Sequence, residues 1–182
     1  MISREEALAL VREKVNNKNL VKHSLAVEAG MRALARYFGE DEELWGLTGL
    51  LHDIDYGETA KDPERHGLVA PEILAPYDLP EEMIYAIKAH PGHFPRESLL
   101  DKALFAVDPL TGLIVAATLM HPTRRIVNVD VPFVMRRFKE KHFARGAKRE
   151  DIKTCEEFGV PLEKFIEIVL SGMKEIADEL GL

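Results

Sequence analysis

Residues Gly49–Asp55 have the sequence GLLHDID, and the adjacent pair His52 and Asp53 in this stretch decides the interpretation of the chain. The apolar spacing before the pair predicts a helix over about residues 40–53, with the pair near its C-terminal end. An imidazole and a carboxylate both suit a divalent cation, and each is costly to bury without a partner. Because a metal ion removes that cost, the pair indicates a metal site in the core.

Further candidate ligands recur along the chain, each in a different expected helix. Bundle-core metal sites are commonly built from side chains on facing helices, so this distribution favours one shared site. The candidates are His23 in a helix over about 18–38, His66 in a helix that starts at Asp62–Pro63, His90 in a helix over about 80–90, and Asp108 within the apolar stretch 98–120.

Helix patterns dominate the rest of the chain as well. Ser3 and Glu6 form a capping-box pattern that predicts a first helix over about 3–16. Residues 54–62 carry Gly57 and predict a loop, and Pro71 is expected to kink or end the helix that contains His66. Further helices are expected at 131–143, 148–158 and 161–180, and only residues 125–131 suggest a short extended piece. The fold class is therefore all-α, a single-domain helical bundle.

Composition limits the classes of function. A chain of 182 residues with 46% hydrophobic and 30% charged residues is expected to fold as one domain with its own core. The net charge of -7 argues against an extended nucleic-acid surface but leaves room for a small phosphorylated substrate.

The single Cys155 and the absence of a signal-peptide pattern predict a cytoplasmic protein. The apolar stretch Leu110–Met120 is too short to cross a membrane and is expected in the core. The oligomeric state stays open.

Three stretches together resemble the HD superfamily of metal-dependent phosphohydrolases: NLVKHSLAV at 19–27, GLLHDID at 49–55 and LFAVDPLTG at 104–112. The superfamily pattern is an early His, a His-Asp pair and a distant Asp, and all four positions match. Pro109 departs from the Glu expected after the last Asp. The stretches HDIDYGE, ERHGLVAPEIL, FAVDPLTGLIVAATLMHPTRRI and RRFKEKHFARGAKRED are similar to an uncharacterised subgroup of predicted hydrolases. The resemblance covers about residues 20–182 and implies an HD-type bundle over 1–182, with a C-terminal helical extension from about 123.

The resemblance also implies a ligand set. It assigns the first metal ion to His23, His52, Asp53 and Asp108. Binuclear members of the superfamily use two more histidines between the pair and the last Asp, a position that His66 and His90 occupy, and Asp53 would then bridge two ions. The alternatives are phosphate binding, proton donation or core hydrogen bonds for the two histidines, and a helix N-cap before Pro109 for Asp108.

Several residues have expected supporting functions. Asp55 is a candidate catalytic group beside Asp53: it would orient a metal-bound water or hold a ligand histidine, and the alternative is a turn residue. Lys88, Arg124 and Arg125 are candidate phosphate-binding residues, with solvated surface charges as the alternative. The basic run 136–149 is expected to be a solvated helix face with Glu140 as a partner. The remaining histidines, His93, His121 and His142, are expected at the surface, with His93 near the pocket rim.

The resulting prediction is hydrolysis of a phosphate ester of a nucleotide or small phosphorylated metabolite. One or two divalent ions (Mn, Fe, Co, Ni, Zn or Mg) would activate water and neutralise phosphoryl charge. Two alternatives stay open: a di-iron oxygenase, because some members of the superfamily use the same six ligands to activate oxygen, and a nucleotide-binding module without catalysis. The intact ligand set argues against a loss of catalysis.

Overall fold

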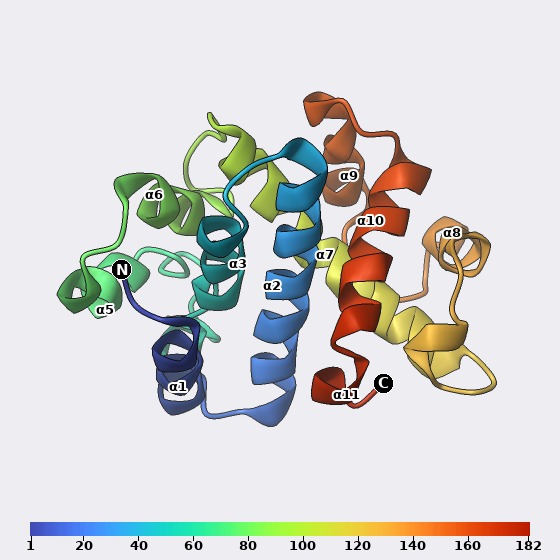
Figure 1. The fold of residues 1–182 in the computed structure, drawn as a ribbon, viewed down its shortest axis with the longest axis horizontal. Coiled ribbons are helices and arrows are strands. Elements are labelled where there is room, and N and C mark those ends of the chain that lie inside the picture. The colour runs from blue at the N-terminus through green and yellow to red at the C-terminus, as the bar shows by residue number, and fades with distance from the viewer.

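The computed structural model describes residues 1–182 and contains helices but no strand, which confirms the all-α prediction. Helix α2 lies at the centre, with α1, α3, α5 and α6 on one side, α8 to α11 on the other, and α7 running behind it (Figure 1). The α-helices are α1 (Arg4–Val15), α2 (Lys18–Phe38), α3 (Glu42–Leu51), α4 (Tyr56–Thr59), α5 (Ala70–Leu74), α6 (Glu81–Ala89), α7 (Leu99–Met120), α8 (Val131–Lys139), α9 (Arg149–Ile152), α10 (Leu162–Glu175) and α11 (Ala177–Leu180). Three 3₁₀ segments, η1 (Ala75–Tyr77), η2 (Ile126–Asn128) and η3 (Lys153–Phe158), complete the chain.

The first two helices begin and end where local sequence predicts. Ser3 caps α1, its hydroxyl accepts a hydrogen bond from the Glu6 amide, and the Glu6 side chain accepts one from the Ser3 amide. Asn17 caps α2 by accepting from two amides of the first turn. Gly39 ends α2 at a φ of 71°, which a residue without a Cβ adopts at little cost.

Glycines at helix crossings bring α2, α3 and α7 close together. A Cβ on Gly49 of α3 would lie 2.9 Å from the carbonyl oxygen of Val27 in α2, and one on Gly30 of α2 would lie 2.8 Å from Val107 of α7. These positions have no room for a side chain, so the helix backbones approach closely. The close crossings bring the histidine of α2, the His-Asp pair after α3 and the aspartate of α7 to one place.

Helix α7 is continuous through Asp108 and Pro109. It begins with a capping box between Ser98 and Asp101, and Asp108 lies in its interior. Pro109 removes one intrahelical donor, but the helix continues to Met120 because its apolar residues are buried on several sides. The N-cap alternative for Asp108 is therefore wrong: the carboxylate points away from its own helix.

Residues Leu110–Met120 are the second half of α7, which is 22 residues long and apolar enough to cross a membrane by length and composition, so the expectation that the apolar stretch is too short was wrong. The expectation that it lies in the core was right, because Leu110, Leu113 and Ile114 are fully buried. In the structure α7 packs against α2, α6, α8, α9 and α10, and 56% of its most apolar 18-residue window is buried. Such burial is typical of the core helix of a bundle.

Other differences from the prediction lie between α3 and α6. Residues 54–62 include the short helix α4, so they are not only loop. No helix begins at Asp62–Pro63: residues 63–68 form turns, and Pro71 lies in the first turn of α5, where it starts a helix instead of ending one. The physical reason is tertiary, because the buried Asp55 carboxylate accepts from the amides of Gly67, Val69 and Ala70.

The C-terminal third is more broken than predicted. Residues 125–131 contain η2 instead of an extended piece. Helix α8 ends at Lys139, residues 148–158 divide into α9 and η3, and Ile176 separates α10 from α11. The basic run 136–149 therefore leaves the helix after Lys139, so its expected helical face is wrong beyond that point.

Candidate metal centre

Four imidazoles converge on two carboxylates at the centre of the bundle. His23 comes from α2, His52 and Asp53 follow α3, and Asp108 comes from α7. His90 is the residue after α6, and His66 lies in the turn before α5. The structure thus brings together all six residues that the sequence grouped.

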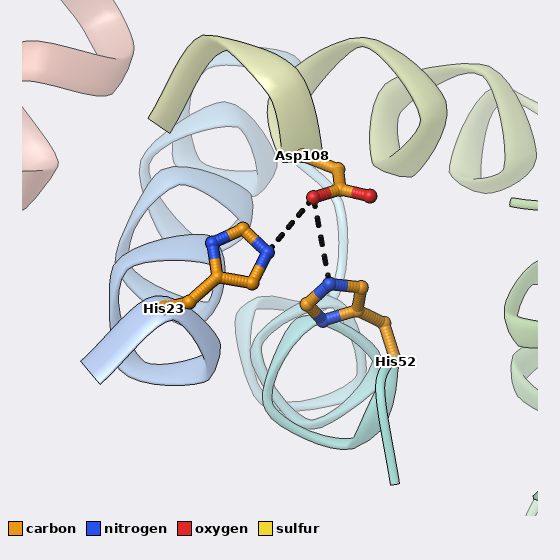
Figure 2. A group of neighbouring side chains, drawn as sticks. All are labelled: His23, His52 and Asp108. Carbon is orange, nitrogen blue, oxygen red and sulfur yellow. Dashed lines mark hydrogen bonds and ion pairs between the residues drawn. The ribbon is translucent and has the colours of Figure 1, made fainter. Parts of the chain in front are cut away.

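One set of contacts lies between α2, α3 and α7, and we name it site 1: His23, His52, Asp108 and the Oδ2 atom of Asp53. His23 Nε2 lies 2.9 Å from Asp108 Oδ1, and His52 Nε2 lies 3.6 Å from the same oxygen (Figure 2). Asp53 Oδ2 lies 3.2 Å from His52 Nε2 and 3.6 Å from His23 Nε2. These separations are close to the spacing of about 3 Å between neighbouring ligands that each lie about 2.1 Å from one ion.

The second set, which we name site 2, consists of His66, His90 and the other carboxylate oxygen of Asp53. His66 Nε2 lies 3.1 Å and His90 Nε2 lies 3.2 Å from Asp53 Oδ1. Asp53 therefore presents one oxygen to each site, as a carboxylate that bridges two ions would. The rings of His66 and His90 meet edge to face with centroids 4.9 Å apart.

Two of the histidines are oriented by the helix that each one ends. Nδ1 of His52 lies 2.7 Å from the Gly49 carbonyl oxygen, and Nδ1 of His90 lies 2.6 Å from that of Ile87. Each contact joins an imidazole to a carbonyl in the last helical turn, where carbonyls lack an intrahelical donor. Because Nδ1 donates to the carbonyl, Nε2 of both rings faces the carboxylates, and in the neutral form of the ring Nε2 is the atom that can bind a metal ion.

Asp55 holds His66 in place. Its side chain is fully buried, and Oδ1 lies 2.9 Å from Nδ1 of His66. Oδ2 accepts from three backbone amides of residues 67–70. Gly67 in this turn has a φ of 83°, and a Cβ there would lie 2.9 Å from Pro91. This geometry places Asp55 behind a histidine and not against the open face of the cluster.

The electrostatics of the cluster favour protonated imidazoles beside ionised carboxylates. Burial lowers the pKa of His52, but the charges of Asp53 and Asp108 outweigh it and raise that pKa well above its usual value. Burial would raise the pKa of Asp53, yet the His52 charge and the neighbouring imidazoles hold it well below the usual range. The pKa of His66 rises to about 9, because hydrogen bonds with Asp53 and Asp55 exceed the effect of burial.

The donors fit a divalent metal ion. Nε2 of His52 is fully buried and makes no hydrogen bond of acceptable geometry, although carboxylate oxygens lie within 3.6 Å. Buried polar atoms nearly always have a hydrogen-bond partner, so a buried imidazole nitrogen that has none and faces two carboxylates fits a metal ligand. Two overlapping groups, His23 with His52 and Asp108, and His52 with Asp53 and His90, have ligand atoms within 4.8 Å of one another.

The structure does not bring the predicted phosphate-binding residues to the cluster. The Lys88 amine lies 4.7 Å from the Phe94 ring centroid, in a cavity that no cluster residue lines. Arg124 and Arg125 are exposed and follow the far end of α7, about 18 Å along the helix from Asp108. His93 and His142 are exposed and His121 is half-buried, and Nε2 of His93 contacts the Pro63 carbonyl oxygen at 3.2 Å.

Sequence reasoning missed a wall that the C-terminal third adds beside Asp108. Ala144, Gly146 and Ala147 line a cavity of about 290 Å³ together with His23, Asp108, Pro109 and Gly112. The Arg149 guanidinium holds this segment by donating to backbone carbonyls, including those of Ala144 and Ala147 at 2.9 and 2.8 Å. It also donates to the carbonyls of Arg137, Phe138, Glu140 and Phe143. The basic run was visible in the sequence, but nothing local predicted that one arginine would fold it.

Comparison with known proteins agrees with this geometry. The family model described as HD domain matches residues 20–123, which include all six residues of the cluster. Ribonuclease Y of Desulfotalea psychrophila is 33% identical over 95 residues, which are 52% of this chain and 18% of the relative. Ribonuclease Y of a Sulfurovum species is 30% identical over 136 residues, 73% of this chain and 27% of the relative. The chain thus spans about a fifth to a quarter of the length of these relatives.

One solved structure matches nearly the whole chain. It is described as a predicted HD superfamily hydrolase involved in NAD metabolism, from Clostridium acetobutylicum. The match has a TM-score of 0.53 at 20% identity and covers 96% of this chain and 99% of the other. At this identity the likeness establishes the fold.

Proposed function

The chain belongs to the HD domain family, and on that premise we propose that it hydrolyses a phosphate ester of a nucleotide or small phosphorylated metabolite with the help of divalent metal ions. The observation that carries the proposal is the position of Asp53, whose two oxygens face separate pairs of inward Nε2 atoms. A carboxylate between two sets of imidazoles is suited to hold two cations a short distance apart.

We assign the protein side chains as follows. His23, His52, Asp108 and Asp53 Oδ2 would hold one ion, and His66, His90 and Asp53 Oδ1 would hold the second. Divalent ions bound there would supply Lewis acidity, which lowers the pKa of bound water and neutralises charge on phosphoryl oxygens. Asp55 keeps Nε2 of His66 aimed at Asp53, so its contribution is to position a ligand.

The open side of the cluster supports a small substrate. His23 and Asp108 are the most exposed members, with side chains 25% and 27% accessible, whereas His52 is 0% and His90 2% accessible. The cavity beside them is about 290 Å³. A phosphate group would therefore enter past His23 and Asp108, while buried rings shield the rest of the site from water. Arg145 and Lys148 flank the cavity wall in sequence and offer positive charge to an anionic substrate.

We also propose that residues 1–182 act as one HD domain with a C-terminal extension from about residue 123. The family match ends at that residue, yet Ala144, Gly146 and Ala147 of the extension line the cavity beside Asp108. The extension would then belong to the substrate site.

The sequence relatives are named as ribonucleases, and a ribonuclease cleaves phosphodiester bonds of RNA. Phosphodiesters are therefore also candidate substrates. The net charge of -7 argues against a long nucleic-acid surface on this chain. We therefore expect activity on small esters to exceed activity on RNA.

The proposal is tested by a screen of phosphate monoesters, small cyclic and linear diesters and RNA, each with Mn²⁺, Fe²⁺, Co²⁺, Ni²⁺, Zn²⁺ or Mg²⁺. We expect metal-dependent release of phosphate or of a nucleotide, abolished in Asp53→Ala. Parallel anaerobic assays with iron distinguish hydrolysis, which needs no oxygen, from an oxygenase. Oxygen uptake with an organic substrate, without phosphate-ester cleavage under any metal, would contradict the proposal.

A further inference from the structure

Two cavities meet at Gly112 on α7. The smaller one, about 290 Å³, lies beside His23 and Asp108. The larger one, about 440 Å³, is also lined by His23 and Gly112 and extends along α7 to Val115 and Leu119. We name the larger cavity the α2–α7 groove; it is lined by Asn19, Lys22, His23, Gly112, Val115, Leu119, Leu180, Gly181 and Leu182. Because both cavities share His23 and Gly112, the groove extends from the rim of the candidate metal centre.

Gly112 differs from the other glycines inside long helices. A Cβ on Gly30, Gly49 or Gly172 would meet a neighbouring helix at 2.6 to 2.9 Å, so close packing explains the missing side chain. A Cβ on Gly46 would meet the Arg32 side chain at 2.5 Å. A Cβ on Gly112 would meet nothing within 4 Å, although glycine inside a helix costs about 1 kcal/mol relative to alanine. Helix packing does not explain Gly112, which is exposed and lines both cavities.

The groove has an apolar face that begins at the candidate metal centre. Asp108, Gly112, Val115 and Leu119 follow one another at helical spacing on α7, over about 16 Å of helix axis. Leu119 is 45% exposed, which is unusual for a large apolar residue in this chain. The C-terminal residues Leu180 and Leu182 line the groove as well. An elongated apolar surface that starts at the proposed phosphate site fits a flat organic group attached to a phosphate.

Charge in the groove fits the same ligand. Lys22 is exposed and lines the groove one residue before His23. The chain has a net charge of -7, so an ammonium group at this position gives local attraction for an anion. Lys22 lies on the α2 wall, and Val115 and Leu119 lie on the α7 wall, so a cation and an apolar surface line the same cavity.

We propose that the α2–α7 groove binds the aromatic or nucleoside part of the phosphate ester and that Gly112 determines specificity by keeping the passage between the two cavities open. The inference rests on the proposed function, because it places the phosphate group at the metal centre. It commits the groove to a small aromatic phosphate ester. A leucine at position 112 would fill the passage, while an alanine would leave most of it open.

The experiment uses two phosphonates that cannot be hydrolysed, 1-naphthylmethylphosphonate and methylphosphonate, titrated calorimetrically into the Mn²⁺-saturated protein. We expect wild type to bind the naphthyl compound at least tenfold more tightly than the methyl compound. Gly112→Leu should abolish this difference; the readout is the ratio of the two affinities, because Gly112 lines both cavities. Gly112→Ala is the matched control and should keep most of the difference. Thermal unfolding checks both variants, which should be at least as stable as wild type because the helix loses a glycine.

Each outcome has a separate meaning. Equal binding of the two phosphonates by wild type would overturn the groove but leave the phosphate site intact. A naphthyl advantage that survives Gly112→Leu would overturn the assignment of Gly112 and of the groove next to it. If neither phosphonate binds, the proposed function falls together with the groove.

Discussion

Site 1 and site 2 share Asp53, yet they are built by different means. Site 1 is assembled by long helices whose crossings are fixed by Gly30 and Gly49 in the core. Site 2 depends on His66, which lies in a turn that the buried Asp55 carboxylate gathers. Site 1 therefore depends on helix packing, whereas site 2 depends on a single buried hydrogen-bond acceptor. Site 2 should therefore be separable from site 1 by mutation.

The largest effect is expected where the sites meet. Asp53→Ala removes the carboxylate that faces all four histidines, so both ions should be lost. Without metal, hydrolysis should fall by roughly a thousandfold or more, because several kcal/mol of transition-state stabilisation are lost. Metal analysis and steady-state kinetics of the purified variant check this. Full metal content with wild-type turnover would remove Asp53 from the centre.

The next effect separates the sites. His66→Ala and His90→Ala should each lower the stoichiometry from about two ions to about one, because site 1 keeps its ligands. His23→Ala is the matched comparison and should deplete site 1. Equilibrium dialysis followed by metal analysis gives the counts. If His66 and His90 instead bind phosphate or donate a proton, their variants would keep every ion and lose only turnover or substrate affinity.

A smaller effect is expected on metal affinity at site 2. Asp55→Asn keeps the size of the side chain but turns one acceptor oxygen into an amide donor, so it weakens the hold on His66 or on the 67–70 turn. Loss of a partner behind a ligand histidine typically costs 10- to 100-fold in metal affinity. We expect that loss at site 2, with affinity at site 1 changed by less than about threefold. Competition with a fluorescent chelator measures both constants, and equal weakening of the sites would show that Asp55 supports the whole centre.

The smallest effect concerns pH in the metal-free protein. The pKa of His66 is raised to about 9 from the usual 6.5, so the charged ring stabilises the fold below pH 6.5 and this contribution disappears as pH rises through about 9. The loss should amount to about 1 kcal/mol, because water screens part of the charge on a side chain that is 15% accessible. Thermal unfolding in a chelator between pH 6 and 10 measures it. His66→Ala is the control and should have a flatter profile; identical profiles would contradict the assignment.

The contrast between the sites also explains how much could be predicted from the sequence. Helices α1 and α2 were predicted closely because their caps, Ser3, Asn17 and Gly39, act through local contacts. The turn around His66 was wrongly predicted as a helix. Its shape depends on hydrogen bonds from its amides to Asp55, which lies 12 to 15 residues earlier. Local patterns carry no information about such a partner.

Long-range contacts also explain the other differences between the prediction and the structure. Asp108 followed by Pro109 is locally a helix start, and only burial of α7 on several sides keeps the helix continuous there. The wall at residues 144–147 depends on six carbonyls that converge on Arg149. Gly112 is visible in the sequence, but its open surroundings are evident only once α2, α7 and the C-terminal residues are in place.

If Asp53 lies between two metal ions, both ions should be visible in a crystal structure of the wild-type protein grown with Mn²⁺, with anomalous scattering recorded at the manganese edge. We expect two anomalous peaks per chain, one beside Asp53 Oδ2, His23, His52 and Asp108, and one beside Asp53 Oδ1, His66 and His90. A single peak at saturating Mn²⁺, Fe²⁺ or Co²⁺, with His66 and His90 free of metal, would contradict it.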